Sequence, residues 1–237
     1  MLENERVDTR PTGATNGTEE QGKLFEVARF PEQECYRIVS LRELKVESEQ
    51  DLEDYYRLLV HPDNREHFSN PPVDASDLKR KLARDHTHAY LAINQEGTVV
   101  GAGGINDAPE SEHDHFLVKV VVHPDYKGRG MGKQLVSELT DIAFLTPAVT
   151  FDSITRRRIQ RERIKLDAAV IRDVEGWDKM PRILRSLGFR FVHLLPNQVT
   201  VKEQSSGVEV LKPTERYEIS REDWQTRKAL RDQANNQ

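Results

Sequence analysis

The chain has 237 residues, of which 36% are hydrophobic and 32% are charged, and its formal net charge is −5. This length suits one domain with a sizeable core and a heavily charged surface. The sequence has no signal peptide and no apolar run as long as a membrane span, and its negative charge argues against a general nucleic-acid binder. The single cysteine, Cys35, cannot form an internal disulfide, which agrees with a reducing compartment. We therefore expect a cytoplasmic protein.

Polar segments flank the expected domain, which spans residues 23–224. Residues 1–22 are rich in Gly, Thr and Glu and hold too few apolar residues to pack, so we expect a disordered tail there. Residues 225–237 are expected to form a polar C-terminal tail. Within the domain, residues 147–163 are an arginine-rich insertion.

A strand and a helix open the domain. β-branched and apolar residues predict the strand over residues 35–46. Ser48 is a helix N-cap, and the apolar residues after it have the spacing of one buried helix face: Leu52, Tyr55, Tyr56, Leu59 and Val60. His61 and Pro62 end this helix, and an irregular connection follows up to Val73. Such a loop can carry function.

A shorter helix and a hairpin come next. The helix begins near residues 74–76, and strands over residues 88–94 and 98–105 are joined by a tight turn that ends at Gly97. The second strand contains three glycines, Gly101, Gly103 and Gly104. Glycines weaken strand packing but admit another backbone or a ligand, so they suggest a groove beside this strand.

Residues 116–144 carry the clearest pattern in the chain. The apolar, β-branched run over residues 116–122 predicts a buried strand. A turn over residues 123–126 leads into the glycine-rich sequence KGRGMG, residues 127–132. Apolar residues at the spacing of one helix face follow, namely Leu135, Val136, Leu139, Ile142 and Ala143. The order is therefore strand, glycine-rich turn, helix.

This order favours phosphate binding, because the first turn of a helix has free N–H groups and a positive dipole end. Two common phosphate loops do not fit. A Walker loop needs Gly at position 127 and Ser or Thr at position 134, which are Lys127 and Gln134. The dinucleotide fingerprint needs Gly at position 133, which is Lys133. The alternative is an ordinary strand-to-helix turn with glycines for tight packing.

The spacing [Gln/Arg]-x-x-Gly-x-[Gly/Ala], preceded by a Val-x-Pro-x-Tyr turn, does fit. This sequence resembles the acyl-CoA-binding motif of the GNAT superfamily of N-acetyltransferases. Lys127 stands where that family usually has Gln or Arg, and it keeps a donor side chain. The resemblance covers residues 36–224, and its specific motif runs from Val120 to Gly132.

The chain continues after the insertion with a strand over residues 164–171, a helix, and a strand over residues 189–195. Pro181 suits the first turn of that helix and Gly188 suits its cap. The apolar stripe of the helix is Met180, Ile183, Leu184 and Leu187. In the GNAT superfamily this helix commonly ends Tyr-x-x-x-Gly-Phe, and this chain has Leu184 at the Tyr position.

The end of the domain is predicted as a hairpin, with strands over residues 199–202 and 208–212, followed by a last strand over residues 216–219. The sequence from Arg216 to Trp224 is similar to the close of the ribosomal-protein N-terminal acetyltransferase branch of the superfamily.

The resemblance implies an α/β (α+β) fold of the GNAT acyl-CoA N-acyltransferase type. It has a mixed central sheet of about seven strands flanked by helices, with strands four and five splayed. Acetyl-CoA, the acetyl donor, would lie in that gap, with no metal. The strand backbone would pair with the pantetheine arm of acetyl-CoA, and N–H groups of the loop would hold its pyrophosphate. A backbone N–H near Val122 would stabilise the oxyanion that forms on the thioester during the reaction. The implied cofactor-binding residues are Val120, Val121, Val122, Lys127, Gly128, Arg129, Gly130, Met131, Gly132 and Lys133.

The implied reaction is direct attack of a primary amine on acetyl-CoA in a ternary complex; the acceptor could be a protein N-terminus, a lysine or a small-molecule amine. An alkylamine must lose a proton before attack, and the candidate bases are His115, Asp114 and Asp167. Since Leu184 removes the tyrosine that many relatives use as general acid, either the thiolate leaves unaided or a hydroxyl such as Tyr126 or Ser186 protonates it.

Several alternatives stay open. The chain could be a non-catalytic acyl-CoA-binding regulatory module. The histidines at positions 113 and 115, or 86 and 88, share one strand face and could bind a metal, but no third and fourth ligand is visible in the sequence. The insertion is either a solvated charged helix or hairpin, or a site for the CoA 3′-phosphate or an acidic partner. The expected partners are acetyl-CoA, an amine acceptor and, in a homodimer, a second copy; membrane and nucleic-acid partners are not expected.

Overall fold

The computed structural model describes residues 24–26, 37–65, 67–107, 115–151, 158–174, 176–202 and 208–235. The strands are β1 Leu24–Glu26, β2 Ile38–Glu43, β3 Thr87–Asn94, β4 Val99–Asp107, β5 His115–Val122, β6 Ala148–Phe151, β7 Arg158–Arg161, β8 Lys165–Ile171, β9 Arg190–Lys202 and β10 Glu209–Ser220. The helices are α1 Glu49–Val60, α2 Pro62–Arg65, α3 Ala75–Arg84, α4 Met131–Leu145, α5 Lys179–Ser186 and α6 Arg221–Asn235, with a 3₁₀ turn at Pro124–Tyr126.

Eight of these strands form one mixed sheet in the order β1-β2-β3-β4-β5-β8-β10-β9, and β6 and β7 form a separate two-stranded sheet. β5 and β8 run parallel, whereas the other described strand pairs are antiparallel. The predicted mixed sheet flanked by helices is therefore confirmed. No helix in the described part of the chain is long and apolar enough to cross a membrane.

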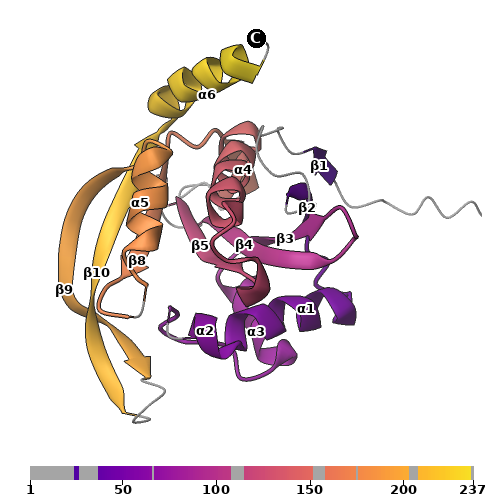
Figure 1. The fold of residues 1–237 in the computed structure, drawn as a ribbon, viewed down its shortest axis with the longest axis vertical. Coiled ribbons are helices and arrows are strands. Elements are labelled where there is room, and N and C mark those ends of the chain that lie inside the picture. The colour runs from indigo at the N-terminus through magenta and orange to yellow at the C-terminus, as the bar shows by residue number, and fades with distance from the viewer. Residues whose placement is uncertain are drawn as a thin grey trace, which may run out of the picture.

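Helices cover the two faces of the sheet unequally. α1 and α3 pack against β3, β4 and β5 on the face that holds Leu91, Ala102 and Val121, which we call the α1 face. α4 packs on the opposite face, the α4 face, with α5 beside β8 and β10 (Figure 1). On the α1 face, Ala169 of β8 is exposed, because α1 and α3 cover only the β3–β5 half of the sheet.

Side-chain caps begin α1 and α3 where the sequence predicts them. The Ser48 hydroxyl accepts a hydrogen bond from the N–H of Asp51 at 3.2 Å. The Asp74 carboxylate accepts one from the N–H of Asp77 at 2.7 Å. Each bond satisfies an N–H that the first helical turn would otherwise leave without a partner, which fixes where the helix starts.

The glycines of β4 have a packing role. A Cβ at Gly103 would lie 2.6 Å from a methyl of Leu139, and one at Gly101 would lie 2.9 Å from the carbonyl oxygen of Val121. α4 therefore approaches β4 too closely for a side chain at Gly103, and the neighbouring strand excludes one at Gly101. This packing accounts for two of the three glycines that the sequence suggested as signs of a ligand groove.

β9 and β10 differ from the sequence prediction. The sequence predicted short strands and a separate hairpin. Instead, β9 and β10 form one long hairpin whose strands continue through Pro196 and Pro213. The pairing register shifts between Lys212 and Thr214, which is where both prolines fall. Because proline has no N–H to donate, it is tolerated at such an irregularity and in an edge strand such as β9.

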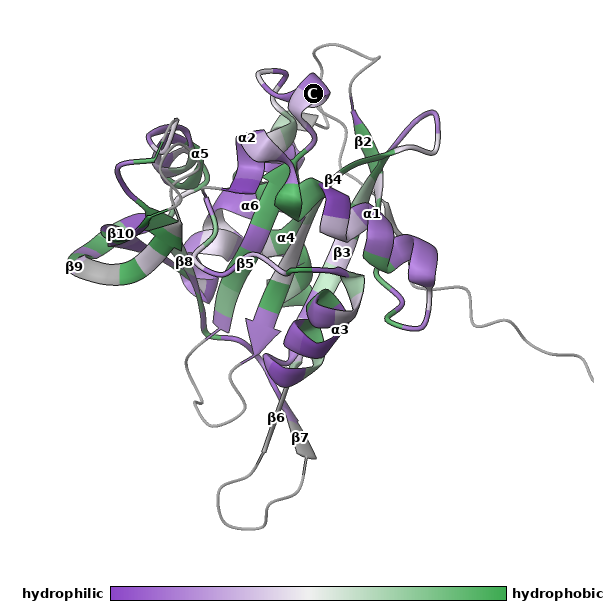
Figure 2. Cartoon of the chain, turned by 90° about the horizontal axis from the view of Figure 1, so that it is seen from below, coloured by the Kyte–Doolittle hydropathy of each residue, from purple (hydrophilic) through white to green (hydrophobic). Residues whose placement is uncertain are grey.

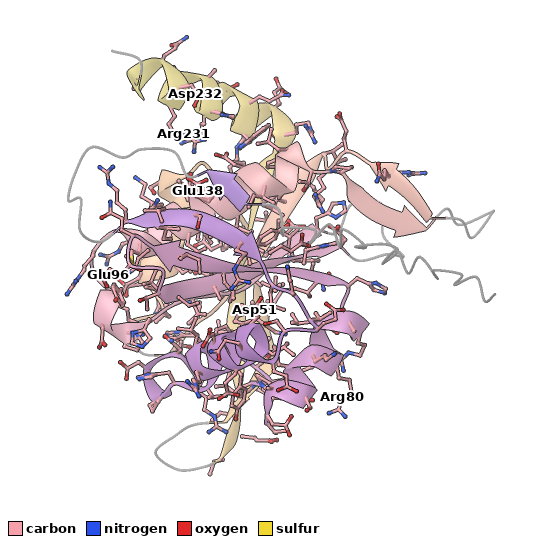
Figure 3. The ribbon with its side chains drawn as sticks, turned by 90° about the vertical axis from the view of Figure 1, so that its right-hand side faces the viewer. Asp51, Arg80, Glu96, Glu138, Arg231 and Asp232 are labelled. Atoms are coloured by element: carbon pink, nitrogen blue, oxygen red, sulfur yellow. The ribbon has the colours of Figure 1, made fainter. Side chains whose placement is uncertain are left out.

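α6 occupies most of the segment expected as a polar tail. Trp224 stacks on Phe144 with ring centroids 5.1 Å apart, and its indole N–H donates to Asp141 of α4 at 2.6 Å. Arg231 points from α6 toward the body of the domain, where it binds Asp141 and the Ser137 hydroxyl (Figure 3). These contacts dock a polar helix that has no continuous apolar face of its own.

The insertion forms a hairpin in its described part, β6 and β7, which projects from the domain (Figure 2). The insertion was interpreted as a charged hairpin in solvent, and its last residue, Arg163, is an exception because it is only 2% exposed. Arg156 and Arg157 lie outside the described residues, as does the expected tail over residues 1–22.

Candidate functional site

β5 and β8 pair over two residues of each strand, Phe116 with Asp167 and Leu117 with Ala168. Beyond Leu117, β5 continues to Val122, and none of the described strands pairs with that edge. The N–H of His123 donates to Val100 of β4 at 2.9 Å, so strand alternation directs the backbone groups of Val120 and Val122 the other way, toward β8. The splayed pair is thus a gap lined by strand backbone.

β5 contains a bulge at the start of this gap. Gly104 of β4 pairs with Val118 and Ala102 pairs with Val121, which leaves one extra residue in β5. The backbone of Lys119 has φ +51°, a left-handed conformation that is uncommon outside glycine. The Tyr55 hydroxyl of α1 donates to the Lys119 carbonyl oxygen at 3.4 Å, and burial raises the pKa of Tyr55. The bulge is therefore tied to α1 by a phenol that stays protonated.

The glycine-rich loop opens α4 with unsatisfied donors. Gly128 and Gly130 have φ of +79° and +82°, and a Cβ at either would meet nothing within 4 Å, so the backbone conformation alone requires glycine. The first helical hydrogen bond of α4 runs from the N–H of Gln134 to Gly130. The N–H groups of Met131 and its next two residues precede that bond and suit an anion.

Cationic side chains flank the loop. Lys127 donates to the carbonyl oxygen of Asp63 in α2 at 2.9 Å, and the Arg129 guanidinium lies 6.0 Å from the centre of the Tyr126 ring. Lys133 is exposed in the first turn of α4. The loop therefore combines open N–H groups, a helix dipole and positive charge, which together favour a phosphate group.

Asp167 lies where β5 and β8 begin to separate. It is fully buried, and its Oδ2 accepts a hydrogen bond from Arg216 at 2.7 Å. Its Oδ1 has no hydrogen-bond partner among the described residues. The Arg216 guanidinium lies 5.3 Å over the Phe116 ring, so the structure brings these three residues together on one face of the sheet.

His115 belongs to a buried ionic cluster at the other end of β5. Its Nδ1 lies 2.9 Å from Asp107, and the Arg163 guanidinium donates to both oxygens of Asp107 at 2.9 and 2.5 Å. Burial alone would raise the pKa of Asp107, but the hydrogen bonds from His115 and Arg163 outweigh it and hold this pKa below its usual value. Arg163 also donates to Ala143 and Thr146 at the end of α4. His115 is 1% exposed and is accounted for as a structural residue.

The remaining predicted residues do not gather at one point. Asp114 lies outside the described residues. Tyr126 lies on the loop side, with its ring 5.8 Å from that of His123, whereas Asp167 lies opposite Phe116. From Phe116 to Val122, β5 spans about 20 Å at 3.3 Å per residue. Leu184 is buried in the core, and the Ser186 hydroxyl donates within its own helix. In the described part of the chain, no three His, Cys, Asp or Glu side chains are grouped to hold a metal ion.

Comparisons with known proteins agree with this geometry. Residues 47–151 match the Acetyltransferase (GNAT) family. This match covers less than half of the chain. The chain is 36% identical over 73 residues to N-alpha-acetyltransferase RimI of Mycobacterium tuberculosis, a match that covers 30% of this chain and 46% of RimI. It is 31% identical over 99 residues to an acetyltransferase of Yersinia pestis, covering 41% of this chain and 64% of that protein.

Solved structures share the fold of this chain at low identity. Spermidine N-acetyltransferase from Vibrio cholerae, in complex with CoA and spermine, superposes with a TM-score of 0.58 at 13% identity, over 78% of this chain and 96% of the other. Ribosomal-protein-S5-alanine acetyltransferase from Vibrio fischeri gives 0.58 at 13% identity, over 85% and 98%.

Sequence reasoning missed the bulge at Lys119 and the cluster around Asp107. The run FLVKVVV reads as an uninterrupted strand, and only the register against β4 reveals the extra residue. Asp107 and Arg163 are 56 positions apart, so no local pattern connects them.

Proposed function

We propose that this chain transfers an acetyl group from acetyl-CoA to a primary amine by direct attack in a ternary complex. The observation that carries the proposal is the gap between β5 and β8, which leads into the glycine loop at the start of α4. One end of the gap offers donors for a pyrophosphate, and its side offers strand backbone for an extended amide-containing arm.

In this proposal the loop holds the donor. The N–H groups from Gly128 to Gly132 bind the pyrophosphate, with Lys127, Arg129 and Lys133 adding positive charge. The backbone of Val120 and Val122 pairs with the pantetheine arm, whereas the backbone groups of Val121, also predicted for this role, face β4 and do not reach the gap. A backbone N–H near Val122 stabilises the negative charge that develops on the thioester oxygen.

The chemical step needs an amine that has lost its proton. The nitrogen lone pair attacks the thioester carbon, the C–N bond forms, and the C–S bond breaks as thiolate leaves. Asp167 is the candidate that lies at the mouth of the gap, and its free Oδ1 can accept a proton or a hydrogen bond. His115 is not assigned a role because Asp107 holds it in the interior, and Tyr126 lies on the donor side.

A non-catalytic acyl-CoA-binding module is the second candidate. Leu184 favours it, since this buried leucine stands where many relatives carry a tyrosine acid. A thiolate is stable enough near neutral pH to leave without a proton donor, so the leucine is also compatible with catalysis.

Two measurements separate these functions. Calorimetry with CoA tests the donor site, and the release of free thiol from acetyl-CoA with a panel of amines, peptides and amino-sugars tests the transfer. We expect CoA binding together with thiol release that depends on the acceptor. CoA binding without such release supports the binding module, and absence of CoA binding contradicts both functions.

A further inference from the structure

Lys119 is a cation that its surroundings do not neutralise. Its half-buried side chain has no hydrogen bond or ion pair with the described residues, and burial lowers its pKa. The two acids that influence it are bound elsewhere: Asp77 pairs with Lys81 at 2.9 Å, and Asp85 pairs with Arg84 at 2.7 Å. A half-buried charge without a partner is unfavourable until it meets an opposite charge.

The position of Lys119 links it to the acceptor. Its carbonyl oxygen accepts the hydrogen bond from Tyr55 of α1, and the charges that act on its ammonium belong to α3 and its C-cap, Asp85. Both helices cover the α1 face. On the α4 face the gap is bounded by α4 and α5, which approach each other at Gly132 and Ile183. An amine that attacks a donor lying in the gap therefore comes from the α1 face, beside the bulge that carries Lys119.

Four charged side chains of β8 and β10 near the mouth of the gap balance one another. Lys165 lies 3.1 Å from Glu218 and 3.6 Å from Asp167, which in turn binds Arg216. These are two cations and two anions on neighbouring strands, β8 and β10. Lys119 therefore adds a net positive charge to the surface that the acceptor meets.

We propose that the acceptor is an amine that also carries a carboxylate, and that Lys119 binds this carboxylate. The inference rests on the proposed function and names the substrate class of its acceptor site. Two sources share this chemistry, a free amino acid and a peptide N-terminus followed by an acidic side chain. A polyamine such as spermidine, which brings only positive charge, is a poor acceptor for this surface.

The test compares acceptors that differ only in charge. Alanine and alaninamide represent free amino acids with and without the carboxylate, Ala-Glu-amide and Ala-Gln-amide represent peptides, and Ala-Lys-amide and spermidine represent cationic acceptors. The variants are Lys119→Met, which removes the charge, and Lys119→Arg, which keeps it. Lys79→Met, an exposed lysine of α3, is the matched control.

The wild-type chain should favour the anionic member of at least one matched pair by about tenfold to a hundredfold in kcat/KM, the range for a hydrogen bond between charged groups. Lys119→Met should remove this preference and leave the neutral acceptor within about twofold of wild type. Lys119→Arg should retain it, and Lys79→Met should match wild type. The pair of acceptors that shows the preference identifies the natural acceptor as a free amino acid or a peptide.

Equal rates for the anionic and neutral members, or a preference for spermidine, would overturn the proposal. So would an equal loss for every acceptor in Lys119→Met, because that result places the effect in the backbone of the bulge. Calorimetry of the same acceptors against the CoA-bound chain decides the question even without turnover. The two failures are therefore distinguishable. Absence of thiol release counts against the proposed function, and absence of a charge preference in acceptor binding counts against the role of Lys119.

Discussion

The two ends of β5 carry different kinds of polar group, paired side chains at one end and open backbone groups at the other. At its start, His115, Asp107 and Arg163 form a buried, mutually paired cluster of side chains. At its end, the bulge and the glycine loop present backbone groups and left-handed residues that leave donors open. Paired buried charges fix a structure, whereas open backbone groups bind a ligand. Stability and donor binding therefore lie at opposite ends of one strand, and mutations should separate them.

Breaking the paired end should have the largest effect. Arg163→Met leaves Asp107 buried without its main partner, so we expect a loss of about 3–5 kcal/mol in the free energy of unfolding, measured by urea titration. The control is Arg182→Met, which removes an exposed helical ion pair with Asp178 and should change stability by only about 0.5 kcal/mol. A weaker affinity of the folded Arg163→Met chain for CoA would show that the two ends are coupled.

The open end should respond in ligand affinity. Gly130→Asp places a negative charge where the pyrophosphate is proposed to bind, and we expect calorimetry to show about a tenfold to hundredfold weaker binding of CoA. Gly97→Asp is a close control, because Gly97 also has a positive φ, +78°, and open space around its Cα. If both variants bind CoA equally well, the loop is not the pyrophosphate site.

His115→Gln tests whether the cluster takes part in chemistry. We expect unfolding to become easier by about 1–2 kcal/mol, the range for a lost buried hydrogen bond to a charged group. The kcat/KM of the folded fraction should stay within about twofold of wild type. A large fall in kcat with normal CoA binding would instead return His115 to the list of catalytic bases.

Acid should produce the smallest effect. The folded pKa of Asp107 lies below its ordinary value of 3.8, so its stabilisation is fully present above that pH and is lost as pH falls toward the folded pKa. The loss from this one group begins near pH 3.8 and grows at lower pH. Asp107→Asn should flatten this part of the stability profile, measured by urea titration at a series of pH values. An unchanged profile would show that other carboxylates dominate.

The comparison also shows which features a sequence reveals. The glycine loop and α4 were predictable because a strand, a turn and a helix face are local patterns, and the caps Ser48 and Asp74 are local as well. The cluster around Asp107 was not, because its members come from β4, β5 and the end of the insertion.

The errors have physical causes. α6 was expected as a tail because its composition is polar, yet Trp224 and Arg231 give it enough contacts with α4 to dock. β9 and β10 were divided at prolines, which the register shift between the two strands accommodates. Lys119 was hidden because a bulge has no sequence signature of its own, and its left-handed backbone is set by pairing with β4 and by Tyr55.

The strand order at the C-terminal edge constrains how the chain folds during synthesis. β10 leaves the ribosome after the other described strands, yet it lies between β8 and β9, and β9 pairs with no other described strand. β8 pairs with β5 over two residues only, so most of the backbone hydrogen bonds of β8 form with β10. The β5–β8 arrangement therefore becomes rigid only after β10 has been synthesised, and a transcript truncated before β10 should yield an aggregation-prone product rather than a smaller working domain.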